Sequence, residues 1–162
     1  MANLNVSSPS NFVTLTISAT DGRTISGDAT TATWTASTAT DIVVPALQDI
    51  TVTNSNGTFR WVQLDSQSRA VVATPATNSL NFNIVLDDTS FFTGQGTTKG
   101  LFNLSNNKTK VYFKFAWGGG STKYLTGSGY LAGLAPKVNP DQPVWISPLI
   151  LEVDGNYLPN TL

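Results

Sequence analysis

The stretch Lys108–Leu134 constrains the fold most strongly, because apolar and polar side chains alternate along its first half. The odd-numbered positions there are apolar, whereas the even-numbered positions carry lysines and a tyrosine. This period of two is typical of a β-strand with one face buried and the other exposed to water. The apolar side chains are Val111, Phe113, Phe115 and Trp117, and the polar ones are Lys108, Lys110, Tyr112 and Lys114.

A glycine-rich turn follows this strand. Gly118–Gly120 allows the chain to reverse, because glycine adopts positive φ without steric cost. A second strand-like segment of similar length comes next, so we predict a long β-hairpin whose apolar face packs against another layer. Its predicted core side chains are Val111, Phe113, Phe115, Trp117, Leu125 and Leu131.

Two glycines lie inside the second strand of this hairpin. Gly127 and Gly129 share the face that carries the leucines. A glycine within a strand usually marks a bulge or the close approach of another group. We expect that group to be either the ring of Phe113 or Phe115, or the backbone of another chain.

The composition is that of one domain with few charges. The chain has 162 residues, of which 40% are hydrophobic and 12% are charged. The charged share is about half of the usual one. Thr, Ser and Asn supply the polar surface instead, as is typical of secreted proteins and of subunits whose surface is covered by neighbouring protein.

Several classes of function are disfavoured by the residues that the chain lacks. A net charge of −1 argues against a nucleic-acid-binding domain built on a basic patch. The chain has neither cysteine nor histidine, which removes thiol chemistry, the commonest general base and the commonest metal ligand. The adjacent carboxylates of Asp87 and Asp88 favour helix capping over catalysis. We therefore predict no enzyme activity, no cofactor and no metal site.

The sequence also lacks the patterns that direct proteins to membranes. No apolar run approaches the length of a membrane span, and the N-terminus has no features of a secretory signal. We expect a soluble protein that is made in the cytosol.

The chain reads as a mainly β protein with a single domain at residues 12–157. Residues 1–11 are polar and predict an extended N-terminal arm, and residues 158–162 predict a C-terminal tail. Residues 21–40, rich in Thr and Ala, predict either a long loop or a weak hairpin.

Three local signals refine this outline. Asn54–Gly57 predicts a tight hairpin turn, because Asn-Gly suits a type I′ turn. Asp87–Ser90, followed by several apolar residues and glycines, predicts one short helix. Val144–Val153 predicts the last strand, and Pro148 places that strand at a sheet edge or a bulge.

The four tryptophans could in principle form a carbohydrate-binding surface. Aromatic side chains on alternating strands are more often part of a core, and we expect this of Trp61, Trp117 and Trp145. Trp34 stands alone in a polar stretch. Its ring either packs on the core of its own subunit or becomes ordered against a neighbour.

The second half of the chain has a recognisable order of segments. The first segment is a strand that ends in an acidic turn, NFNIVLDDTS. It is followed by a short apolar helical piece, KGLFNL, and by the alternating strand, KVYFKFAW. YLTGSGYLAGL follows, then a loop at Pro140–Pro143 with an acid, and a closing strand that runs into Asp154 and Gly155. In this order of segments, Leu80–Tyr157 resembles a tail tube protein of a tailed bacteriophage.

The resemblance implies a β-sandwich or barrel-like subunit with one short flanking helix, long hairpins and extended arms. In that family six copies form a ring, and stacked rings form a hollow tube that carries DNA. The implied partners are other copies of the chain and other tail proteins, such as a sheath, a terminator or a baseplate or tip. DNA would pass without sequence-specific binding, and no membrane is involved. The implied location is the virion tail, after assembly in the host cytoplasm.

An assembly of this kind requires interface residues, which we expect in the segments that are poor in core residues. The predicted interface residues are Asn3, Leu4, Arg23, Thr24, Ile25, Asp28, Trp34, Tyr157 and Leu158. The lysines at 108, 110 and 114 are expected to face outward or to pair with carboxylates, because free lysines in a conduit would hold DNA. The alternative functions are a capsid decoration protein and a carbohydrate-binding β-sandwich module.

Overall fold

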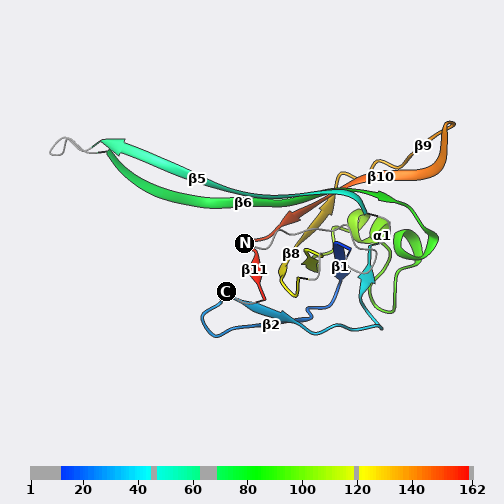
Figure 1. The fold of residues 1–162 in the computed structure, drawn as a ribbon, viewed down its shortest axis with the longest axis horizontal. Helices are drawn as coiled ribbons and strands as arrows, with labels where there is room; N and C mark the ends of the chain where they lie inside the picture. The colour runs from blue at the N-terminus through cyan, green and yellow to red at the C-terminus, as the bar shows by residue number, and fades with distance from the viewer. Residues whose placement is uncertain (1–11, 45–46, 63–68, 119–120, 161–162) are drawn as a thin grey trace.

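The computed structural model describes residues 12–44, 47–62, 69–118 and 121–160. The mainly β fold predicted from the sequence is confirmed (Figure 1). The strands are β1 (Thr14–Ser18), β2 (Arg23–Ile25), β3 (Ala32–Trp34), β4 (Ile42–Val43), β5 (Leu47–Val62), β6 (Arg69–Val85), β7 (Val111–Ala116), β8 (Tyr124–Ala132), β9 (Lys137–Asn139), β10 (Gln142–Val153) and β11 (Leu158–Pro159). A π-helical turn, η1 (Thr89–Thr93), and a short helix, α1 (Leu101–Asn106), lie between β6 and β7.

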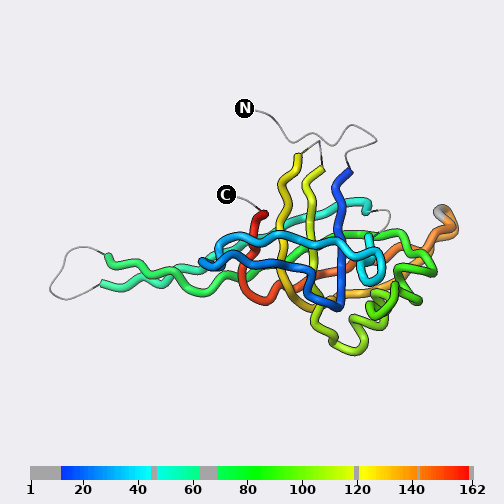
Figure 2. Tube along the Cα trace, turned by 90° about the horizontal axis from the view of Figure 1, so that it is seen from below, coloured from blue at the N-terminus to red at the C-terminus, as the bar shows by residue number. Residues whose placement is uncertain are grey.

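One large antiparallel sheet contains most of the strands. Its order is β4-β1-β7-β8-β10-β6-β5, with β11 added to β8 and β9 added to β10. β8 joins two layers, because its first part pairs with β7 and its last part, from Gly129, pairs with β10. In Figures 1 and 2, β1, β7 and β8 cross the direction of β5, β6 and β10. The result is sandwich-like, and among the described strands the sheet does not close into the barrel that was the alternative expectation.

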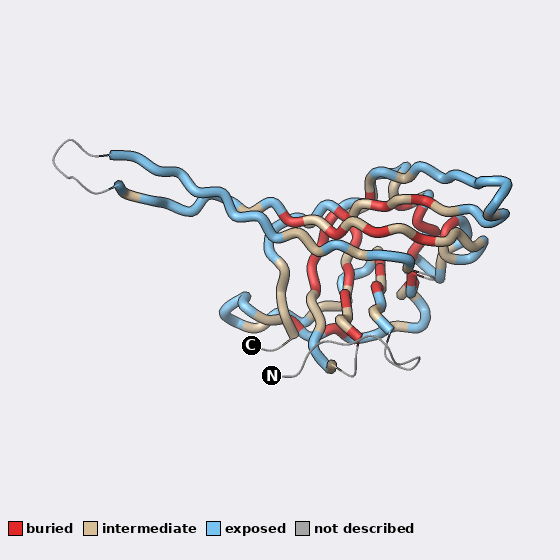
Figure 3. The backbone as a smooth tube through the Cα atoms, turned by 45° about the horizontal axis from the view of Figure 1, so that its top comes forward, coloured by how far each residue is buried: buried red, intermediate tan, exposed pale blue. Residues whose placement is uncertain are grey.

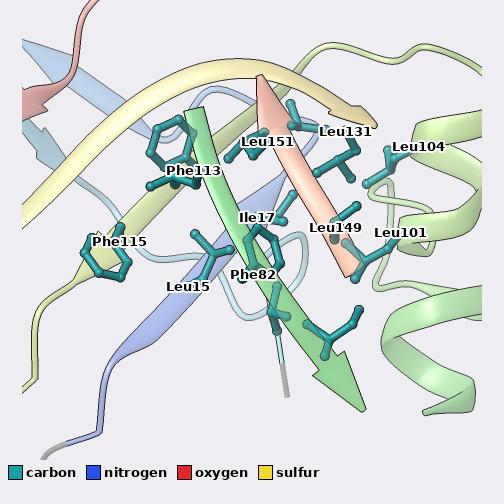
Figure 4. Close-up of a cluster of buried hydrophobic side chains, with 14 of the residues drawn as sticks. Leu15, Ile17, Phe82, Leu101, Leu104, Phe113, Phe115, Leu131, Leu149 and Leu151 are labelled. Carbon is teal, nitrogen blue, oxygen red and sulfur yellow. The ribbon is translucent and has the colours of Figure 1, made fainter. Parts of the chain in front are cut away.

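The core lies between these two layers and beneath the helical segment (Figure 4). β7 alternates strictly between buried and half-buried residues, as its sequence pattern predicts. Of the predicted core hairpin, Val111, Phe113, Phe115 and Leu131 are buried, whereas Trp117 and Leu125 are half-buried and pack against the core from its border. The rest of the molecule adds the buried core side chains Leu15, Ile17, Leu80, Phe82, Ile84, Phe91, Leu101, Leu104, Leu149 and Leu151.

The glycines of β8 let two groups approach closely. A Cβ at Gly127 would lie 2.6 Å from the tip of the Phe113 ring, which therefore crosses the strand pair where a side chain is missing. A Cβ at Gly129 would collide with the carbonyl of Glu152 in the neighbouring strand β10. Both glycines thus serve packing within the subunit.

One predicted turn is wrong. Asn54–Gly57 does not reverse the chain, because these residues lie inside β5 and pair with β6. A register shift between Asn56 and Thr58 marks a bulge at this point. A bulge uses the conformational freedom of Asn-Gly without ending the strand. The polar run Asp65-Ser66-Gln67-Ser68 also predicts a turn, and it lies outside the described residues.

The predicted weak elements form short strands. Within residues 21–40, β2 and β3 make a two-stranded sheet, which is the hairpin alternative rather than the loop. Within the predicted C-terminal tail, Leu158 and Pro159 form β11 on β8. The N-terminal arm at residues 1–11 lies outside the described residues.

Candidate assembly interface

β5 and β6 continue as an isolated two-stranded arm beyond the rest of the sheet (Figure 1). The last residue of β6 to pair with β10 is Asn78, opposite Val153. From there outward, the described parts of the two strands pair only with each other. At about 3.4 Å per residue, the run from Asn54 to Val62 is roughly 30 Å long. Figure 3 shows that this arm is exposed along nearly its whole length.

The arm carries apolar side chains on both of its faces. Residues that pair across an antiparallel ribbon point to the same side. One face therefore holds Phe59 and Val72, together with Trp61 and Ala70. The rings of Phe59 and Trp61 are stacked, with centroids 5.8 Å apart. The opposite face holds Arg60, Val62, Arg69 and Val71.

We call the exposed apolar side chains of the arm, three on one face and two on the other, the arm patch. Their exposed fractions run from 38% for Trp61 to 62% for Val62. Single exposed apolar residues are ordinary, but a contiguous group usually marks a surface that contacts another molecule. The arm patch consists of Phe59, Trp61, Val62, Val71 and Val72.

The base of the arm is held by the C-terminal segment. The hydroxyl of Tyr157 lies 2.9 Å from the carbonyl oxygens of both Thr53 and Ser79, which face each other across β5 and β6. Burial, together with the nearby Glu152 carboxylate, raises the pKa of Tyr157 to about 12, so the phenol keeps its donor proton. The Asn78 side chain donates to the carbonyl of Gly155 at 2.7 Å. These contacts fix the direction in which the arm leaves the sheet.

An apolar groove of about 440 Å³ lies at the opposite end of the molecule. Phe92, Phe102 and Trp145 are 53%, 43% and 54% exposed there. Phe91 is buried beneath them and packs edge-on against Phe92, with ring centroids 4.8 Å apart. The groove is lined by Leu86, Asp87, Asp88, Phe91, Phe92, Phe102, Pro136 and Trp145.

The local sequence explains why these aromatic rings reach the surface. Leu101 and Leu104 anchor α1 in the core, which turns Phe102 outward on the other side of the helix. The Asp87 carboxylate accepts a hydrogen bond of 2.6 Å from the amide of Ser90 and holds the start of η1. The predicted short helix is therefore present as two separate pieces, with glycines between them.

The hairpin of β2 and β3 holds most of the described residues that we expected at an interface. Trp34 is buried in its own subunit, where its Nε1 donates to Asp41 at 3.1 Å and its amide donates to the Tyr124 hydroxyl at 3.0 Å. Of the two expectations for Trp34, the structure favours packing within the subunit.

The charged residues of this hairpin are held by local contacts. The Arg23 guanidinium bonds to Asp21 at 2.9 Å and lies over the ring of Tyr112. Partial burial acts to raise the pKa of Asp21, but the hydrogen bonds from Arg23 outweigh it and lower the pKa. Asp28, which is exposed, accepts a hydrogen bond from Ser26 that lowers its pKa.

The remaining predicted interface residues fall in three places. Thr24 and Ile25 are exposed on β2, while Tyr157 and Leu158 are half-buried at the C-terminal segment. Asn3 and Leu4 lie outside the described residues. A role of these residues in contacts between subunits stays a prediction.

The lysine row is partly paired within the subunit. The amine of Lys110 lies 2.7 Å from the Asp154 carboxylate, which raises the pKa of Lys110 and lowers the pKa of Asp154. The Lys114 amine lies 4.5 Å from the centre of the Tyr124 ring. The sequence suggested Asp87, Asp88 or Glu152 as possible partners of the lysines, whereas the observed partner of Lys110 is Asp154.

The arm patch and the aromatic groove were missed by the sequence reasoning. Trp61 and Trp145 were expected in the core, and both are exposed. A signal was present for the arm, because Phe59, Trp61 and Val62 place apolar groups on both faces of one strand. Such a strand has no polar face to turn toward water, so it needs either two covering layers or a partner.

Comparisons with known proteins do not indicate a function for this chain. No family model and no curated protein matches the chain. In the described part of the chain, no group of three or more acidic residues is placed to hold a metal ion. None of the helices there has the length and apolar character needed to cross a bilayer.

Proposed function

We propose that this protein is a self-assembling structural subunit, and specifically a tail tube protein of a tailed bacteriophage. The observation that carries the proposal is the arm of β5 and β6. It exposes an apolar patch that has no partner in the described part of its own chain. An exposed apolar arm suits a polymerising subunit, which uses such a surface to contact its neighbours.

The order of elements in the second half of the chain supports the finer part of the proposal. The resemblance rests on a strand, an acidic turn, a helical piece, an aromatic strand, a glycine-containing strand, a loop and a closing strand. These segments correspond to β6, the turn at Asp87 and Asp88 that leads into η1, then α1, β7, β8, the turn between β9 and β10, and β10 in that order. The correspondence concerns the fold, and the assignment to phage tails rests on the sequence resemblance.

In the proposed assembly, six copies form a ring and the rings stack into a tube in the virion tail. The low charge of the chain suits a subunit whose surface is largely covered by other subunits. Pairing of Lys110 with Asp154 reduces the number of free amines that could hold passing DNA. A sheath, a terminator and a baseplate or tip are the further partners that this role requires.

A carbohydrate-binding module is the second candidate, and the groove is the observation that favours it. Exposed Trp145 and Phe102 beside the carboxylates of Asp87 and Asp88 provide apolar faces and hydrogen-bond acceptors, which sugars require. Carbohydrate binding at the groove would not explain why the arm exposes apolar side chains. Glycan binding that is lost in Trp145→Ala, by a protein that stays monomeric, would favour it over the tube.

Sedimentation of the purified protein tests the proposal. We expect a concentration-dependent shift from monomer to rings and larger polymers. Stable trimers would indicate a decoration protein, and a monomer at high concentration would contradict self-assembly. The sample should be free of denaturant and of fusion tags, because either would mask the apolar surfaces.

A further inference from the structure

We propose that the arm patch of one subunit docks into the aromatic groove of a second copy of the chain. This inference rests on the proposed function, because it takes the partner of the arm to be another copy. It goes further by naming the two surfaces that meet: Phe59, Trp61 and Val72 on the arm, and Phe92, Phe102 and Trp145 at the groove.

The two surfaces lie too far apart to meet within one subunit. In Figures 1 and 2, the arm leaves one end of the long axis, while η1, α1 and the start of β10 lie at the other end. The base of the arm is fixed by Tyr157 and Asn78, so the arm cannot fold back over the sheet without breaking these hydrogen bonds. The contact is therefore between molecules.

The chemistry of the two surfaces matches. Both present aromatic rings to water, and neither is covered by any described part of the chain. Aromatic side chains and arginine are the residue types that most often dominate the energy of an interface. The stacked pair of Phe59 and Trp61 presents an apolar face, and the groove offers an open, mostly apolar space of about 440 Å³.

Opposite charges favour the same pairing. Arg60 and Arg69 are the only charged residues of the described arm from Asn54 outward, and both belong to its second face. Among the described residues that line the groove, Asp87 and Asp88 are the only charged ones. The arginines do not need to form ion pairs, because opposite charges within about 10 Å steer two surfaces together and suppress wrong partners.

The arrangement of the two surfaces determines the symmetry of the contact. A patch that meets a different surface on the next copy makes a head-to-tail contact, which closes into a ring or continues as a filament. Two aromatic side chains bury roughly 300–500 Å². This is below the roughly 800 Å² per partner of a stable interface, so each contact is weak alone and gains strength in a closed ring.

Disulfide trapping tests the pairing directly, because the chain has no native cysteine. Ala70→Cys places a thiol on the arm beside Trp61, and Pro136→Cys places one at the groove. Mixing the two variants under mild oxidation should give a cross-linked dimer that neither forms alone. The matched control pairs Ala70→Cys with Thr33→Cys, an exposed position on β3, and should give no dimer.

Substitutions on the arm and in the groove provide a second test of the pairing. Phe59→Ser with Trp61→Ser in the Ala70→Cys chain should lower the cross-linking rate at least about tenfold. In the same assay, Asp88→Lys should slow cross-linking, and Arg60→Glu with Arg69→Glu on the arm should restore it. If reactive thiols are shown to be present and no arm-to-groove dimer forms, the inference is overturned.

A chain that carries both Ala70→Cys and Pro136→Cys separates this inference from the proposed function. A ladder of cross-linked species that ends at six chains supports both the docking and the closed ring of the proposed function. A ladder that continues without limit supports the docking and overturns the closed ring. Two outcomes would overturn the docking and still support the tube. One is tubes in micrographs without an arm-to-groove cross-link, and the other is tubes together with a cross-link between Ala70→Cys and the control Thr33→Cys.

Discussion

At the scale of single residues, the subunit depends on close contacts that tolerate little change. The ring of Phe113 lies over Gly127 and meets Tyr157 edge-on, with ring centroids 6.3 Å apart. Tyr157 in turn holds the base of the arm through its hydroxyl. One chain of contacts thus links the core to the element that we propose to assemble the protein.

Substitution of the two glycines of β8 should have different effects. Gly127→Ala forces only the buried Phe113 ring to move, and overpacking of this kind costs about 1–3 kcal/mol. Gly129→Ala meets the backbone of Glu152, so β8 and β10 must separate and the cost should be larger. Denaturant unfolding of both variants measures the difference. Equal stabilities would show that β10 shifts freely at this position.

Tyr157→Phe should destabilise the subunit by about 1–2 kcal/mol, because it leaves two half-buried carbonyl groups without their donor. The folded-state pKa of about 12 lies above the ordinary 10.0. The stability that Tyr157 contributes is therefore complete below pH 10 and is lost as the pH rises toward 12.

The difference in unfolding free energy between wild type and Tyr157→Phe should therefore shrink between pH 10 and pH 12. All other titratable groups are the same in the two proteins, so their contributions to the pH dependence of unfolding cancel in this difference. A difference that stays constant over that range would mean that the Tyr157 hydroxyl has no special environment in the folded state.

At the scale of elements, the sequence predicted those parts whose pattern reflects burial on one face. β7 alternates, β8 carries Gly127 where the Phe113 ring crosses, and both strands are central in the sheet. Pro148 was expected at an edge or a bulge. It pairs with Asn83 on one side, and on the other it falls between the residues of β10 that pair with β9 and those that pair with β8.

The arm could not be predicted in the same way, because local propensity does not specify how far a strand continues. Asn54–Gly57 has the composition of a turn, yet pairing along the whole of β6 keeps it in a strand. Trp61 and Trp145 have the residue type of a core, and only the topology shows that they lie beyond it. The sequence signal at Phe59, Trp61 and Val62, apolar groups on both faces of one strand, does not distinguish a second covering layer of the same chain from a partner molecule.

Loss of the arm patch should impair assembly and spare the fold. Phe59→Ser with Trp61→Ser removes exposed rings that do not contact the core, so the unfolding free energy should change by less than about 0.5 kcal/mol. Thr51→Ser, an exposed change on the part of β5 that lies within the sheet, serves as the control. A large loss of stability in the double variant would mean that the arm packs on its own subunit.

At the scale of the whole molecule, the docking that we propose would make the chain a head-to-tail building block, because its exposed arm and its exposed groove lie at opposite ends. Each copy offers one surface of each kind, so assembly leaves both ends of any open chain able to grow. Closure into a ring satisfies every arm and every groove at once. The few charges of the chain and its polar, uncharged surface agree with a subunit that is largely surrounded by its own kind.

Negative-stain micrographs of the purified protein at high concentration test this account most directly. We predict rings or hollow tubes of uniform width for the wild type. The Phe59→Ser, Trp61→Ser variant should give only dispersed particles of the size of one subunit. Dispersed single subunits in the wild-type sample, at concentrations where sedimentation also shows no association, would contradict the claim that the chain assembles through its arm.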